Sequence, residues 1–105
     1  MAVKQTAGRD TLGQFAPKFA QLNDDVLFGQ VWNRTDKLSL RDRSLVTVVA
    51  LLAQGLTDSS FQYHLATARQ NGVTREEMAE VLTHAAFYVG WPKAWACLLY
   101  TSDAA

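Results

Sequence analysis

The two histidines, His64 and His84, are the residues of this sequence best suited to acid–base chemistry. Histidine titrates near neutral pH, so it can accept and return a proton during a reaction. His64 shares a predicted helix face with Phe61, Leu65 and Ala68, where burial would lower its pKa and leave a neutral imidazole. We therefore expect His64 to be the principal catalytic acid or base. The alternative is a core histidine whose hydrogen bonds are satisfied.

The second histidine belongs to a polar stripe beside the apolar face of its helix. Glu80, His84 and Tyr88 follow one another at intervals of four, so they are neighbours on one helix surface. We expect His84 to face a pocket rim or a subunit contact and to support catalysis. The Tyr88 hydroxyl could donate to an oxyanion, or the ring could serve only in packing.

The N-terminal third of the chain is predicted to be helical. Pro17 can begin a helix but cannot continue one, so it divides two short helical pieces. Asn23 or Asp24 is expected to cap a further segment that carries an apolar face.

Three longer helices follow, predicted over 39–55, 57–72 and 74–90. Each begins at a capping side chain and ends at a glycine, and Pro92 suits the first turn of a last helix. No alternating strand pattern competes with these signals. The sequence predicts an all-α fold of five or six helices.

The helix over 39–55 is unusually apolar. Residues 45–53 are apolar on every side apart from Thr47, and a helix that is apolar all round must be buried all round. A chain of 105 residues has difficulty covering such a helix. Together with Trp32, Trp91 and Trp95, this pattern predicts a homo-oligomer.

Composition excludes several classes of function. The formal net charge is +0 and the basic residues are scattered, so we expect no nucleic-acid partner. No apolar stretch approaches the roughly 20 residues that span a bilayer, and the N-terminus is too polar for a signal peptide, which predicts a cytoplasmic protein without a membrane partner. One cysteine and two histidines without a cluster of further ligands predict neither a disulfide nor a metal site.

Three stretches, "LSLRDRSLVTVVALLAQG", "YHLATARQNGVTREEMAEVLTHAAFY" and "GWPKAWA", resemble the carboxymuconolactone decarboxylase family. This family lies in the superfamily that also holds the alkylhydroperoxidase-D proteins, and the resemblance covers about residues 8–96. It implies an alkylhydroperoxidase-D-like helical domain over residues 1–96, assembled into a homotrimer or homohexamer.

The sequence also departs from the patterns of this superfamily. Its peroxidase members carry a C-x-x-C pair followed by a histidine, and the matching residues here are Thr57, Ser60 and His64. Because the thiolate is the nucleophile in that chemistry, thiol peroxidase activity is excluded. Many decarboxylase members have glutamate where this chain has Ser60, so one expected acid or base is absent.

The resemblance implies a cofactor-free lyase or isomerase-type enzyme that acts on a lactone or keto acid. Proton transfer would fall to His64 with His84 in support, and the substrate would contact Tyr88, Ser60 and Arg41. The guanidinium of Arg41 could hold a carboxylate in a bidentate pair, or it could be a solvated charge. The alternative function is a non-catalytic oligomeric module that binds a small molecule in the same fold.

The last nine residues, "CLLYTSDAA", match the translation of a transposase sequencing adapter. We therefore expect residues 97–105 to be a non-native tail. They are expected to lack an apolar helix face and to contribute little to stability.

Overall fold

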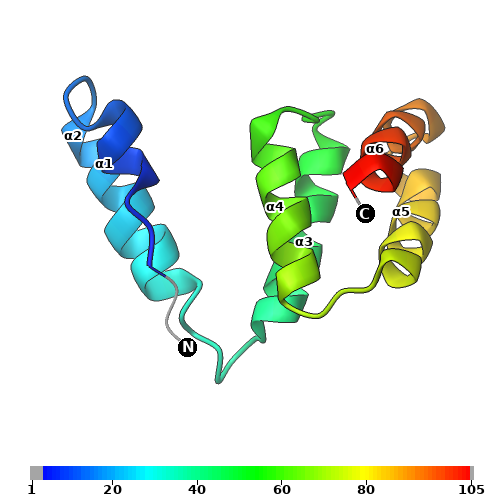
Figure 1. Cartoon of the computed structure of the whole chain (residues 1–105), viewed down its shortest axis with the longest axis horizontal. Helices are drawn as coiled ribbons and strands as arrows, with labels where there is room; N and C mark the ends of the chain where they lie inside the picture. Colours follow the sequence, from blue (N-terminus) through cyan, green and yellow to red (C-terminus); the bar gives the residue numbers. More distant parts are fainter. Residues whose placement is uncertain (1–3, 105) are drawn as a thin grey trace. The chain divides into compact units, whose positions relative to one another are not determined.

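The computed structural model describes residues 4–104, and within this range it contains helices and no strand (Figure 1). Six α-helices and one π-helical segment are present there, which confirms the predicted all-α class. No helix in this range combines the length and apolar character needed to cross a bilayer. The chain divides into two compact units, Met1–Leu40 and Arg41–Ala105. The single domain expected over residues 1–96 stays a prediction.

The first unit contains α1 (Ala7–Leu12), α2 (Pro17–Gln21) and the π-helical segment η1 (Leu22–Val31). Pro17 stands in the first turn of α2, as expected for a residue without an amide hydrogen. Because η1 continues directly from α2, no helix begins at Asn23 or Asp24. The prediction of an N-cap at this place is wrong.

Asp24 instead caps α1, which lies 15 residues earlier in the chain. Its carboxylate accepts hydrogen bonds from the amides of Gly8 and Arg9, at 2.9 Å and 3.0 Å. A Cβ atom at Gly8 would lie 2.7 Å from this carboxylate and 2.8 Å from the carbonyl oxygen of Ala20, so only glycine fits. Arg9 also pairs with Asp25 at 2.7 Å. These bonds join α1 to η1.

The second unit contains four helices, α3 (Leu40–Ala53), α4 (Ser59–Gln70), α5 (Arg75–Val89) and α6 (Trp91–Ala104). In Figure 1 they run from green to red. One hydrophobic core joins them, because each contributes side chains to the same cluster. The buried members are Val48, Leu52, Phe61, Leu65, Ala68, Val73, Met78, Leu82, Ala85, Ala86, Ala94 and Cys97.

Local signals set the boundaries of these helices. The Asp58 carboxylate accepts the amide hydrogen of Ser60 at the start of α4. Thr74 and Glu77 form the predicted capping box of α5. Gly55, which follows α3, has φ 75°, a left-handed conformation that side-chain-bearing residues rarely adopt. The caps predicted for α4 and α5 are confirmed.

Helix α3 is not covered on all sides within the structure. Val48 and Leu52 are fully buried, whereas Val46 is 62% exposed. The buried hydroxyl of Ser44 accepts a hydrogen bond from the Asn71 side chain at 3.0 Å, which ties the start of α3 to the end of α4. The exposed side of α3 is compatible with the homo-oligomer predicted above, which stays a prediction.

The C-terminal segment continues α6 to Ala104. Cys97 is fully buried in the core, and Leu98 is partly buried against it. Thr101 is also buried, and its hydroxyl donates to the carbonyl oxygen of Cys97 at 2.7 Å. The expectation that this segment lacks an apolar helix face is therefore wrong for residues 97–101. Its origin from an adapter stays a prediction.

Candidate functional site

An apolar groove lies along α5, with Val49 of α3 at one side. Its volume is about 470 Å³. The floor is built by Val49 and by aliphatic side chains of α5, and the rim carries the three polar residues of the predicted stripe. The lining residues are Val49, Glu80, Val81, His84, Ala85, Tyr88 and Val89.

The rings of His84 and Tyr88 lie together at this groove. Their centroids are 5.4 Å apart and their planes differ by 31°. Both side chains are exposed, and Tyr88 is 81% exposed. An imidazole and a phenol therefore stand side by side above an apolar floor. This arrangement offers a proton acceptor and a hydrogen-bond donor to a ligand whose apolar body lies in the groove.

His64 lies on α4 in a different environment. Its side chain is half-buried, and its Nδ1 atom is shielded from solvent. The imidazole meets the ring of Tyr63 edge-on, with centroids 5.0 Å apart. Burial lowers the pKa of His64 below its ordinary 6.5, so the imidazole is neutral at neutral pH. This agrees with the environment predicted for His64.

Ser60 stands one helical turn before His64 on α4, so the two residues share a helix face. The side chain of Ser60 is exposed, and its amide donates to Asp58 at 3.0 Å. A hydroxyl at this position can donate or accept a hydrogen bond, but it cannot replace a carboxylate as an acid or base near neutral pH.

Arg41 forms an ion pair with Glu77, and its guanidinium lies 4.0 Å from Asp42. The backbone hydrogen bond from Thr74 and the side-chain bond from Arg41 lower the pKa of Glu77. Glu77 precedes His84 by seven residues, or roughly 10 Å along α5 at 1.5 Å per residue. Arg41 is thus paired with Glu77 near the start of α5, far from Tyr88 near its end.

The structure brings together His84, Tyr88 and Glu80, and it separates them from the other predicted site residues. The lining of the groove includes none of His64, Ser60 or Arg41. Sequence reasoning missed Val49 as part of the floor, because a helix that is apolar on all sides gives no sign of which face meets a ligand. Within residues 4–104, no three side chains of His, Cys, Asp or Glu gather as a metal site would require.

The helical fold and the groove define a small all-α protein with a histidine–tyrosine pair beside an apolar floor. The profile of the carboxymuconolactone decarboxylase family matches residues 17–103. The chain therefore belongs to the carboxymuconolactone decarboxylase family.

A curated relative is the 4-carboxymuconolactone decarboxylase of Acinetobacter baylyi (strain ATCC 33305 / BD413 / ADP1). It is 35% identical to this chain over 89 residues, which are 85% of this chain. The chain spans about 65% of the length of this relative.

Proposed function

We propose that this protein is a cofactor-free carboxy-lyase or isomerase-type enzyme that acts on a lactone or keto acid by histidine-mediated proton transfer. The observation that carries the proposal is the pairing of His84 with Tyr88 above the apolar floor of the groove. Membership of a family with a relative named as a decarboxylase supports the same reaction class.

The reaction follows from the groups at the groove. When a carboxylate leaves as CO2, the electron pair of the broken carbon–carbon bond passes into the neighbouring carbonyl and forms an enolate. The hydroxyl of Tyr88 donates a hydrogen bond to the enolate oxygen. Protonated His84 then delivers a proton to the carbon that lost CO2, and the neutral imidazole regains a proton from solvent. An isomerisation would use the same two groups without loss of CO2.

The geometry favours His84 over His64 as the acid or base, which reverses the order expected from sequence. His84 stands at a groove with a second polar ring beside it, whereas His64 is half-buried on α4 and lines neither this groove nor the pocket beside Arg69 described below. His64 remains the rival candidate, because its neutral imidazole could also accept a proton.

The second candidate function is a non-catalytic module that binds a small carboxylate or lactone, also as a homotrimer or homohexamer. The observation that favours it is Ser60, which offers a hydroxyl where an acid or base is expected. Such a protein would keep the groove and bind ligands without turning them over.

A substrate screen distinguishes the two functions. Purified protein is mixed with 4-carboxymuconolactone and a panel of lactones and keto acids, and CO2 release and ultraviolet absorbance are followed. The enzyme proposal expects turnover of at least one compound that falls when His84 is replaced by glutamine. Binding by calorimetry without turnover of any compound would support the binding module and contradict the enzyme.

A further inference from the structure

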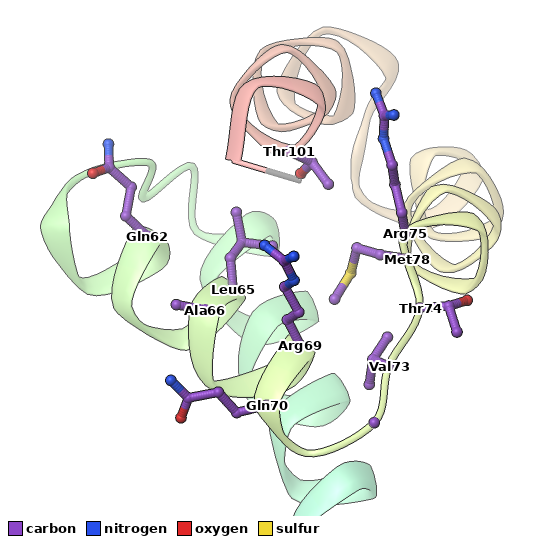
Figure 2. A pocket seen from close by; sticks show the side chains of 11 residues that line it. Gln62, Leu65, Ala66, Arg69, Gln70, Val73, Thr74, Arg75, Met78 and Thr101 are labelled. Atoms are coloured by element: carbon purple, nitrogen blue, oxygen red, sulfur yellow. The ribbon is translucent and has the colours of Figure 1, made fainter.

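A second pocket lies where α4 ends and α5 begins, with Thr101 of α6 at one side (Figure 2). Its volume is about 760 Å³, within the roughly 300–1,000 Å³ of small-molecule sites. We call it the Arg69/Arg75 pocket, after the two cationic side chains in its lining.

The floor of the Arg69/Arg75 pocket is apolar. Leu65, Val73 and Met78 line it, and all three are buried members of the hydrophobic core. Their surfaces extend the core to the pocket wall, so an apolar ligand body would be shielded from water there. An apolar surface of this kind favours a ring or a hydrocarbon chain over a free inorganic ion.

The rim of the pocket is cationic. Figure 2 shows the long side chains of Arg69 and Arg75 beside the apolar floor. No acidic residue is among the lining residues. Neither arginine forms an ion pair with any carboxylate that the structure describes, whereas Arg9 and Arg41 do.

The two arginines lie at opposite ends of their helices, so the helix dipole affects them differently. Arg69 lies in the last turn of α4, where a cation suits the helix dipole, so its position has a structural explanation. Arg75 is the first residue of α5, where a cation opposes the dipole. The amides of Thr74 and Glu77 at this end are used by the capping box, and the guanidinium groups are the charged groups that the pocket offers to a ligand.

We propose that the Arg69/Arg75 pocket binds a small organic anion that has an apolar body and a carboxylate. The body contacts Leu65, Val73 and Met78, and the carboxylate accepts hydrogen bonds from the guanidinium groups. Guanidinium and carboxylate match in geometry and charge, which distinguishes a carboxylate from a neutral group of the same shape.

This site is separate from the one in the proposed function. Gln62, Ala66 and Arg69 recur at intervals of four and three, so they share one face of α4. His64 is two residues from Gln62 and from Ala66, which places it on the opposite side of the helix. Neither histidine lines the Arg69/Arg75 pocket, so binding there can be tested separately from catalysis.

The test uses the 105-residue chain and two probes of one shape, 2-naphthoate and its neutral analogue 2-naphthamide. Each is titrated into isotope-labelled protein, and amide chemical shifts give the affinity and the location. The proposal expects shifts centred on Leu65, Val73 and Met78. It also expects 2-naphthoate to bind roughly tenfold more tightly than 2-naphthamide, the size of effect a hydrogen bond to a charged group provides.

Substitutions test whether the two arginines cause the preference for 2-naphthoate over 2-naphthamide. Arg69→Gln together with Arg75→Gln should remove the preference for naphthoate, since both side chains are exposed and the fold should remain intact. Lys37→Gln, which removes a positive charge from a residue outside the pocket lining, should leave the preference unchanged. Ala66→Phe should weaken both probes by filling the pocket. Equal affinity for the two probes, shifts elsewhere, no binding of either probe, or a double variant within about twofold of the parent would overturn the proposal.

Discussion

At the scale of single residues, the two histidines lie in different environments, which give the same type of side chain different properties. His64 is half-buried beside Tyr63, and burial lowers its pKa. His84 is exposed and lies beside Tyr88 at an apolar groove. Burial keeps the His64 imidazole neutral, but a catalytic group must also reach a ligand. We therefore propose His84 as the group that transfers the proton, with His64 as the rival candidate.

The burial of His64 predicts a pH dependence of stability. Its pKa is lower in the folded protein than the 6.5 of an unperturbed histidine, so the unfolded state binds the proton more readily. The stability it provides is complete above about pH 6.5 and is lost as the pH falls toward the folded-state pKa. The melting temperature should fall between about pH 7.5 and about pH 5.5, and His64→Gln should reduce that fall.

The matched control is His84→Gln, which removes an exposed imidazole. It should show the same fall in melting temperature as the parent. Equal falls in the parent and in His64→Gln would show that the burial of His64 does not affect stability.

Asp24 allows a second prediction at this scale. Burial raises its pKa, but hydrogen bonds from Asn23, Arg9 and Gly8 outweigh this effect and lower the pKa overall. Asp24→Ala removes the acceptor from two amides of α1, so hydrogen exchange at Gly8 and Arg9 should become faster. Asp36→Ala, a change of an exposed residue, should leave these rates unchanged. Protected amides in Asp24→Ala would mean that α1 is held by other contacts.

At the scale of helices, capping contacts between residues close in the sequence were predictable, whereas contacts between distant residues were not. The capping box of Thr74 and Glu77 spans three residues, so the sequence alone predicts it. Asp24 has the residue type of a local cap, but its partners lie 16 and 15 residues away in α1, a pairing that no local pattern reveals. The stripe of His84 and Tyr88 follows from helical spacing, whereas the contribution of Val49 to the groove depends on how α3 packs.

Helix α6 gives a prediction that differs from the one made from sequence. Because Cys97 and Leu98 contact the core, removal of residues 97–105 should lower the melting temperature clearly. Leu98→Ala should cost about 1–2 kcal/mol, below the roughly 2–5 kcal/mol of a fully buried leucine. Leu99→Ala, the same change at a residue that is 58% exposed, should cost much less. Equal melting temperatures for the truncated and full chains would show that the end of α6 does not pack.

At the scale of the whole molecule, we propose that exposed aromatic residues form the surface for the predicted self-association. Phe87 contacts Trp91 edge-on across the junction of α5 and α6, with ring centroids 5.6 Å apart. Trp91 and Trp95 are 54% and 62% exposed and lie one turn apart on α6. Large exposed aromatic patches are typical of protein–protein interfaces.

We expect sedimentation to show a homo-oligomer at micromolar concentration and Trp95→Glu to shift it toward the monomer, because a charge would be buried at the interface. Leu56→Glu, a similar change at an exposed residue between α3 and α4, should keep the assembly. A parent protein that sediments as a monomer would contradict the assignment of this surface.

We propose that His84 transfers the proton at the groove. The most direct measurement is kcat for the parent, His84→Gln and His64→Gln with the substrate found by the screen, each variant being checked for folding by circular dichroism. The claim predicts that His84→Gln loses on the order of a hundredfold in kcat, as expected for removal of a general acid or base, while His64→Gln stays within about threefold of the parent. A folded His84→Gln protein with nearly full turnover, together with an inactive His64→Gln protein, would contradict the role of His84. It would indicate that His64 on α4 is the catalytic residue.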